Sequence, residues 1–451
     1  MRRIVGIILI AVLLMPAFAG CGSSPQPAVK RTGATVDSVI LPLEAQRESE
    51  AAQVSAADSR IGEAISDPNT VQPEELFLVR PEGTKGILVA YDLSTGRESF
   101  RLPAGLVSTN GKHYYVATAL PTSTLLQVFA LPGGGLARDL LLHGRWSLSA
   151  VSHTGRWLAL TRIPGRTEKE EWTRNGQWQT EIRIIDGTSG QLIDELRLDG
   201  NFEVETLSAD GRALFLIQHL PAVNPDHYLI RLYDVQAGAL QHNPLIDKRA
   251  PIDQVMAGLA WDGIASPDGR WLLTLYLSTR RNAAFIHALN LHHRFPVCID
   301  LPSGDGDFTR LKHYTLALAP GGAMLYAANP ALGIVAEVDM SSLTVKRTVT
   351  FEPASEAAGV YEAQAPPSRS VMSPDGRMLY FAGRSTIWVY DTKKGSVRAP
   401  IDAGVDVVGL GLSDDGSRLY VAGNSDRLQV FDAASGQALE SPDRQRQAGG
   451  W

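Results

Sequence analysis

The sequence predicts an all-β protein in which one four-stranded antiparallel unit is repeated around a ring. Three observations support this prediction. A tight turn of the Asp-Gly type recurs along the chain, and a second hairpin pattern recurs between its copies. No stretch between them carries the 3.6-residue apolar period of a long helix. A period that holds two hairpins, and hence four strands, is what a blade of a β-propeller requires.

The first repeated element is a tight turn between two apolar strands. Asp-Gly and Asn-Gly supply the positive φ that a short hairpin needs, and aromatic and β-branched strand formers follow the turn. The copy at residues 373–383, SPDGRMLYFAG, shows the pattern clearly. The turns of the seven copies lie at Asn110, Thr154, Asp210, Asp268, Gly321, Asp375 and Asp415. Successive turns are therefore 40 to 58 residues apart.

The second repeated element is a hairpin whose turn carries Asp and then Gly, as in IWVYDTKKGSV (387–397) and LQVFDAASGQAL (428–439). The Asp bonds to the backbone two residues on, and the Gly closes the turn in the left-handed region. Eight copies of this hairpin accompany seven of the first turn. Residues 75–103 therefore either complete an eighth blade or close a ring of seven. We expect seven blades, with eight as the alternative, in a propeller over 74–441 followed by a tail over 442–451.

These two repeats resemble the YVTN-type repeats of WD-like propellers. The resemblance is strongest in the last two units, where SPDGRMLYFAG and SDDGSRLYVAG each precede a hairpin. It implies the fold more strongly than the function, because propellers serve as binding platforms, lactonases, dehydrogenases and assembly factors.

The N-terminal residues are predicted to be a targeting signal. Two arginines precede an apolar run of about 12 residues, which is too short to span a bilayer. The sequence Phe18-Ala19-Gly20-Cys21 resembles the lipobox of bacterial lipoproteins, with Phe18 where Leu is usual. The resemblance implies a signal peptide over 1–20 and a lipid on Cys21, which would anchor the protein to a membrane outside the cytoplasm. Residues 21–73 contain few large apolar side chains, so we expect a flexible tether there.

Composition excludes several classes of function. The net charge of −6 leaves no basic surplus for a phosphate backbone, so nucleic-acid binding is disfavoured. Only two cysteines, Cys21 and Cys298, are present, which rules out a disulfide framework and a Cys-rich metal site. No G-x-S-x-G, H-E-x-x-H or phosphate-loop motif is found. We therefore expect no catalytic residues, no metal, and no cofactor beyond the lipid anchor.

The long insertions predict which face of the propeller is functional. They all fall between the second and third strands of a unit, or between units, and strand alternation places these connections on one face. The longest insertion between second and third strands, at 164–180, carries Trp172, Arg174 and Trp178, a composition typical of interfaces. The alternative is an extended hairpin whose Trp rings pack on each other. Arg280 and Arg281 with Arg310 are a second candidate, as a basic spot for an acidic ligand, unless they are only solvated loop charges.

The sequence therefore predicts a membrane-anchored, extracytoplasmic propeller that acts as a binding scaffold through its long-loop face. Its partner would be another envelope protein or a small ligand. One alternative is a hydrolase resembling propeller lactonases, which needs acid–base or metal-binding residues from several blades at the channel mouth. The other is an envelope assembly factor resembling the pyrroloquinoline-quinone-type propeller lipoproteins. Their motif expects a Trp soon after the Thr-Gly turn, and this sequence lacks it.

Overall fold

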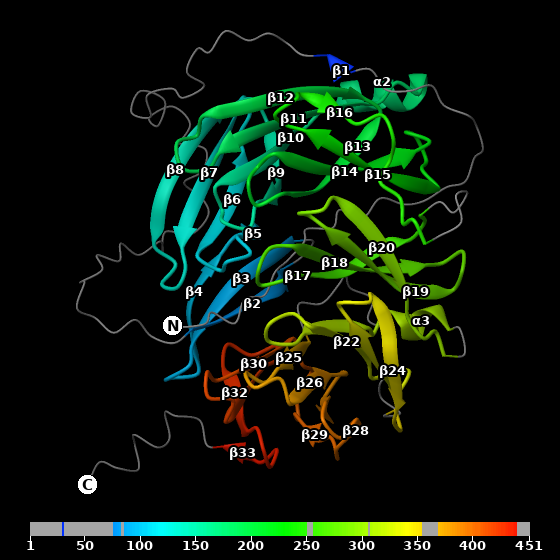
Figure 1. The fold of residues 1–451 in the computed structure, drawn as a ribbon. Helices are drawn as coiled ribbons and strands as arrows, with labels where there is room; N and C mark the ends of the chain where they lie inside the picture. The colour runs from blue at the N-terminus through cyan, green and yellow to red at the C-terminus, as the bar shows by residue number, and fades with distance from the viewer. Residues whose placement is uncertain are drawn as a thin grey trace.

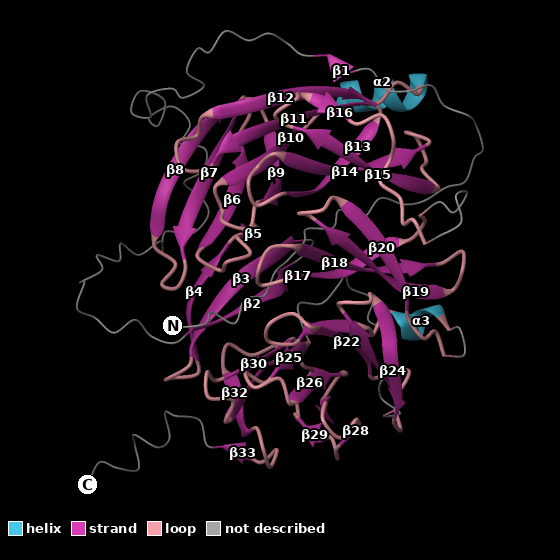
Figure 2. Ribbon diagram, in the orientation of Figure 1, coloured by secondary structure: helices cyan, strands magenta, loops and turns pink. Residues whose placement is uncertain are grey.

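Eight antiparallel sheets follow one another around a ring (Figure 1). The computed structural model describes residues 29–30, 75–82, 85–249, 256–304, 307–353 and 369–439. This part of the chain consists mainly of strands. The helices α2 (Arg166–Asn175) and α3 (Phe308–Leu311) lie at its periphery (Figure 2). Neither helix is long and apolar enough to cross a membrane. The predicted signal peptide, Cys21 and the C-terminal tail lie outside the described residues.

The sheets are numbered as blades 1 to 8 in chain order. Blade 1 consists of β2 (Glu75–Glu82), β3 (Lys85–Asp92) and β4 (Arg97–Leu102), and blade 2 of β5 (Leu106–Val107), β6 (His113–Ala119), β7 (Ser123–Ala130) and β8 (Leu136–His143). Blade 3 consists of β9 (Trp146–Val151), β10 (Trp157–Arg162), β11 (Gln179–Asp186) and β12 (Leu192–Asp199), and blade 4 of β13 (Asn201–Leu207), β14 (Ala213–Leu220), β15 (His227–Asp234) and β16 (Ala239–Leu240).

Blade 5 consists of β17 (Leu259–Ala265), β18 (Trp271–Ser278), β19 (Ala283–Asn290) and β20 (Phe295–Asp300), and blade 6 of β21 (Thr315–Leu318), β22 (Met324–Asn329), β23 (Ile334–Asp339) and β24 (Thr344–Thr350). Blade 7 consists of β25 (Ser370–Met372), β26 (Met378–Ala382), β27 (Thr386–Asp391) and β28 (Ser396–Val397), and blade 8 of β30 (Gly409–Leu412), β31 (Arg418–Ala422), β32 (Leu428–Asp432) and β33 (Ala438–Leu439). Two short strands extend this set, because β1 (Val29–Lys30) pairs with β12 and β29 (Ile401–Asp402) pairs with β27.

The ring has eight blades, so the expectation of seven was wrong and the alternative of eight holds. Strands β2, β3 and β4 form a separate sheet, with three strands among the described residues. One face of this sheet packs Leu76 and Leu78 against Tyr420 of blade 8, and the other packs Phe77 against Tyr114 of blade 2. Because both of its faces are buried between neighbours, this sheet fills a full blade position.

The repeated turns form because their side chains satisfy the local backbone. In blade 7 the Ser373 hydroxyl donates to the Asp375 carboxylate (2.6 Å) and accepts from the Met378 N–H (2.8 Å). The same carboxylate accepts from the Arg377 N–H (3.0 Å), and Gly376 takes the required positive φ of 73°. These contacts hold the pKa of Asp375 below its usual range. The pattern is local in sequence, which explains why it was predictable.

The hydrophobic core lies between neighbouring blades. Each of its clusters joins two adjacent sheets, and one of the largest joins Leu275 and Ile286 of blade 5 to Leu316 and Leu325 of blade 6. The first strands of several neighbouring blades also contact one another, so they lie nearest the centre of the ring. Stability is therefore distributed over the seams between blades, as expected for a propeller.

Strand alternation gives the ring two unlike faces. The turns between first and second strands, and between third and fourth strands, lie on what we call the short-loop face. The other connections lie on the long-loop face, where α2 joins β10 to β11 and α3 precedes β21. The insertion after β16 departs from this expectation. Residues 241–249, which we call the strap, run along outer strands, since the Leu245 N–H donates to Ile230 O (2.8 Å).

Candidate functional site

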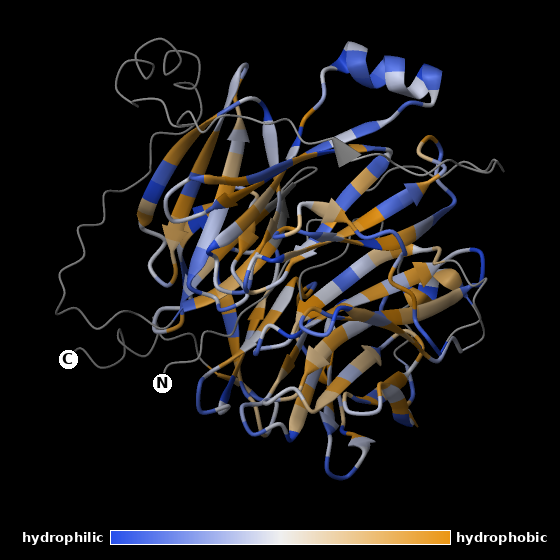
Figure 3. Ribbon diagram, turned by 45° about the horizontal axis from the view of Figure 1, so that its top comes forward, coloured by the Kyte–Doolittle hydropathy of each residue, from blue (hydrophilic) through white to orange (hydrophobic). Residues whose placement is uncertain are grey.

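Helix α2 lies on the long-loop face and stands off the ring (Figure 3). The Glu168 carboxylate accepts from the Gly165 N–H (3.3 Å) at its start, and Gly176 ends it at a φ of 69°. An Arg166–Glu170 pair at 2.9 Å adds support one turn apart. None of its residues is buried. The helix lacks an apolar face, which is why neither sequence interpretation, a loop or an extended hairpin, anticipated it.

The two tryptophans predicted as binding residues pack on each other. The ring centroids of Trp172 and Trp178 are 5.6 Å apart, and both side chains are half-buried. The Arg162 guanidinium lies 5.8 Å from the Trp172 ring and also bonds to Glu168 of the helix. Trp172 and Trp178 therefore fasten α2 to blade 3. Arg174, the third predicted residue, is exposed near the end of the helix.

The three predicted arginines lie in two different places. Arg280 and Arg281 follow β18, where they approach Asp226 and Asp300 at 3.9 Å each. Arg310 lies on α3, where its Nε donates to Ala331 O (3.0 Å). Each guanidinium thus has its own protein partner.

Arg310 belongs instead to a group of basic residues at the mouth of the central channel. Lys312 and His313 lead into β21, and Arg369 directly precedes β25, so both stretches enter first strands from the long-loop face. The pKa of His313 is lowered to about 4, first by burial and then by the positive charges of Arg369, Arg310 and Lys312. The three cations therefore lie near enough to His313 to act on its pKa. We call Arg310, Lys312, His313 and Arg369 the basic cluster.

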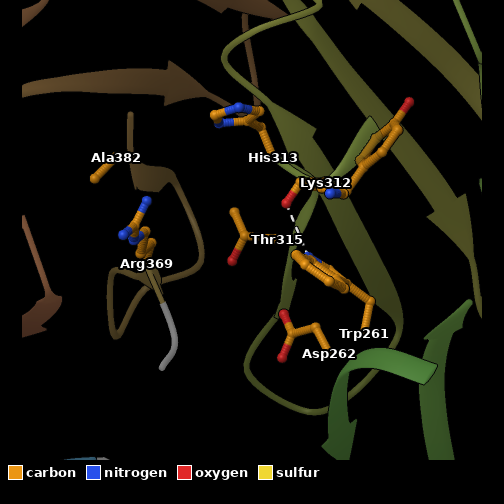
Figure 4. Close-up of a pocket in the computed structure, with 8 residues that line it drawn as sticks. Trp261, Asp262, Lys312, His313, Thr315, Arg369 and Ala382 are labelled. Carbon is orange, nitrogen blue, oxygen red and sulfur yellow. Dashed lines mark hydrogen bonds between the residues drawn. The ribbon is translucent and has the colours of Figure 1, made fainter. Parts of the chain in front are cut away.

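A small cavity of about 20 Å³ is lined by three members of the basic cluster, Lys312, His313 and Arg369. Figure 4 shows His313, Thr315 and Asp262 on one side and Arg369 and Ala382 across from them. The indole Nε1 of Trp261 donates to Lys312 O (2.8 Å) and fixes the loop that leads into β21. A cavity of this size holds about one water-sized group. It therefore suits the tip of a single polar group better than a whole small molecule.

Asp262 is the acidic member of this site. Burial raises its pKa to about 6, although its carboxylate accepts from the Gly263 N–H (2.8 Å). Its negative charge is therefore lost as the pH falls through about 6, and the site then becomes more positive. The arrangement can hold an anionic oxygen by charge-assisted hydrogen bonds, which are shorter and stronger than neutral ones. Across the described residues, no group of three His, Cys, Asp or Glu is placed to hold a metal ion.

Sequence reasoning found only Arg310 among the residues of this site. Lys312, His313 and Arg369 come from connections into two blades, and Asp262 comes from a third. Only closure of the ring brings them together. The one available signal was their place at the entry to a first strand on the long-loop face.

No protein-family model matches the sequence, and no curated protein matches it. Among solved structures, the chain is similar to dihydro-heme d1 dehydrogenase NirN in complex with DHE, with a TM-score of 0.51 and 15% identity over 84% of this chain and 75% of that one. It is also similar to the Dos1 propeller (TM-score 0.45, 10% identity, 76% and 86% covered). A third is Kuenenia stuttgartiensis hydrazine synthase (TM-score 0.40, 13% identity, 73% and 94% covered). An identity of 15% shows a similarity of fold alone. The eight sheets around the ring define the chain as a β-propeller protein.

Proposed function

We propose that this protein is a membrane-anchored, extracytoplasmic β-propeller that binds an acidic group of another envelope protein on its long-loop face. The observation that most directly supports an acidic partner is the basic cluster, with its cavity of about 20 Å³. Anchoring rests on residues 18–21, which resemble a lipobox, and on the lipid that Cys21 would then carry.

The size of the cavity favours a protein partner over a small molecule. Pockets for small ligands usually enclose roughly 300–1,000 Å³. This one admits a single carboxylate, such as an Asp or Glu side chain or the end of a chain, while the rest of the partner lies on the surrounding face. Lys312 and Arg369 supply opposite charge, and the Trp261–Lys312 hydrogen bond holds the site before the partner arrives.

Helix α2 supplies a second contact on the same face. Its outer surface is charged and none of its residues is buried, so it is available to a partner without local unfolding. Trp172 and Trp178 pack where α2 meets blade 3, so a partner that reaches both α2 and the basic cluster gains affinity from the two contacts together.

The proposal is tested by direct binding to an immobilised acidic peptide, using the full chain in detergent. Lys312→Ala and Arg369→Ala should each weaken binding about tenfold, because charge-assisted hydrogen bonds contribute roughly 1.5–3 kcal/mol. Arg377→Ala is the matched control, since it removes the same charge from blade 7 on the short-loop face. Equal affinity in all four proteins, or no binding by any of them, would contradict the proposal.

One observation favours a hydrolase as a second candidate. Asp262 and His313, from neighbouring blades, line the same cavity, which is the convergence that such an enzyme requires. A screen of lactones and esters, with Asp262→Asn as the comparison, separates the two functions. Hydrolysis that is lost in this variant would replace the binding proposal.

A further inference from the structure

A second and much larger cavity opens at the outer rim, where blades 4, 5 and 6 meet. Its volume is about 500 Å³, within the usual range for small-molecule sites. Its walls include Tyr228 and Ile230 of β15, Phe285 of β19 and Cys298 of β20. It lies on the circumference of the ring and shares no lining residue with the channel-mouth cavity.

The strap encloses this cavity by occupying free strand edges. Since β16 pairs with β15 at only two residues, the outer edge of β15 remains open beyond it, and there the Leu245 N–H donates to Ile230 O (2.8 Å). The Asp247 carboxylate accepts from the Cys298 N–H (2.8 Å), which belongs to the outermost strand of blade 5. These bonds hold the strap across the seam, so the cavity is built by specific contacts.

A further bridge ties the strap to the neighbouring blade. The Arg249 guanidinium donates to Cys298 O (3.1 Å) and to Leu343 O (3.1 Å). Its hydrogen bonds are thereby committed to backbone carbonyls and to Asp247. Arg249 therefore has a structural task and is not the cation that would meet a ligand.

The walls of the cavity are aromatic and aliphatic. Behind Tyr228 and Phe285 lies Tyr276, whose ring stacks on both, with centroids 5.5 Å and 5.4 Å away. Ile246, on the strap, lines the cavity and is 48% exposed, which is unusual for a large apolar side chain. Such a lining favours a ligand with an apolar, ring-containing body.

One loosely held cation faces this apolar lining. The Arg281 guanidinium lies 5.0 Å from the centre of the Phe285 ring and 3.9 Å from Asp300. The Asp300 side chain is 78% exposed, and such long, solvated ion pairs contribute little. Arg281 can therefore exchange this partner for the anionic group of a ligand at low cost.

We propose that this rim cavity binds a small organic anion with an apolar, ring-containing body and one carboxylate. The body lies against Tyr228 and Phe285, and the carboxylate pairs with Arg281. The site is independent of the proposed function at the long-loop face, so either can fail without the other.

The test uses 2-naphthoate and its neutral analogue 2-naphthylmethanol as probes of the full chain. Titration calorimetry measures their affinities, and alkylation of Cys298 by iodoacetamide, followed by mass spectrometry, locates them. Burial raises the pKa of the Cys298 thiol to about 12, so alkylation is slow and an occupied cavity should slow it further. We expect Arg281→Ala to weaken naphthoate binding about tenfold and to leave the alcohol unchanged.

Two variants keep this result specific. Arg280→Ala removes a neighbouring charge that does not line the cavity and should change neither affinity. Ile246→Trp enlarges an exposed lining residue and should abolish both binding and protection of Cys298 without lowering the melting temperature. No binding of naphthoate, or binding that Arg281→Ala leaves unchanged, would overturn the proposal.

Discussion

Two of the seams between blades each contain a buried glutamate, and the two carboxylates differ in their hydrogen bonding. Between blades 6 and 7, Glu337 accepts hydrogen bonds from the Tyr390 hydroxyl (2.6 Å) and from two nitrogens of Arg347 (2.6 and 2.9 Å). Between blades 4 and 5, both oxygens of Glu205 are buried and accept no hydrogen bond, and the Nε2 atom of His287 lies 3.8 Å away. The first carboxylate fastens two blades together, and the second does not.

This difference in hydrogen bonding indicates that the two seams have different roles. Unsatisfied buried groups are rare in native proteins because each one lowers stability. Burial raises the pKa of Glu205 to about 8, so it is mostly protonated at pH 7. The same seam holds the rim cavity, and Tyr276 contacts both His287 and the cavity wall. The seam between blades 4 and 5 therefore gives up stability at the place where the ring has room for a ligand.

The largest effect should come from removing Arg347, the cation that pairs with Glu337 between blades 6 and 7. Arg347→Ala leaves Glu337 buried without its cation, which is expected to lower the free energy of unfolding by about 3 kcal/mol. Urea unfolding at pH 7 measures this loss. Arg398→Ala, which removes a looser pair with Asp391 at 3.5 Å, should lower it by less than about 1 kcal/mol. Equal losses would show that the two pairs contribute alike.

The second-largest effect should come from replacing Glu205, whose buried carboxylate accepts no hydrogen bond, by glutamine. Because the pKa of Glu205 is raised to about 8 in the folded protein, stability is lost as the pH rises toward that value. The pKa of His287 is lowered by burial to about 4, so its opposite contribution appears only below about 6.5. Between pH 6.5 and 8 the wild type should therefore lose about 1.5 kcal/mol relative to Glu205→Gln.

Urea unfolding of both proteins across that pH range measures the difference. Parallel curves for the wild type and Glu205→Gln would contradict the assignment of a raised pKa to Glu205. They would also remove the contrast between the two seams.

The smallest effect on stability should come from loosening the strap. Arg249→Ala removes two hydrogen bonds to carbonyls and two long contacts to Asp247, at 3.3 and 3.4 Å. The Asp247 carboxylate keeps the backbone N–H groups of Cys298 (2.8 Å) and of residue 249 (2.9 Å), so the free energy of unfolding should fall by only about 1 kcal/mol. It should nevertheless raise the rate of Cys298 alkylation several-fold, because the strap would cover the cavity less well. Arg294→Ala serves as the control, because its pair with Asp234 joins blades 5 and 4 at short-loop turns, away from the strap. An unchanged alkylation rate would mean that the strap does not enclose the cavity.

The repeated turns could be predicted because their causes are local. Ser373, Asp375 and Gly376 satisfy their own backbone within a few residues, and the sequence displays that pattern directly. The number of blades could not be predicted with the same security. It depends on whether the sheet that contains Leu76 packs against both neighbours, and that packing is set by closure of the ring.

Apart from Arg281 and Arg310, the residues of the two proposed sites could not be predicted from the sequence, for related reasons. The basic cluster is assembled from connections that are distant in the chain, so only Arg310 was anticipated. Glu205 occupies a bulge, where the pairing of β13 with β14 skips one residue between Val204 and Thr206. Such a bulge redirects one side chain and cannot be read from an alternating apolar pattern. Helix α2 was missed because it has no buried face to impose a period.

We infer that the long-loop face is the binding face, and site-specific photo-crosslinking in intact cells can distinguish it from the short-loop face. The photoreactive amino acid p-benzoylphenylalanine is placed at Arg174, on α2, or at Ser189, in a short-loop turn of the same blade. Both positions are exposed. We expect crosslinked partners from position 174 and none from position 189. Crosslinks from position 189, with none from position 174, would contradict it.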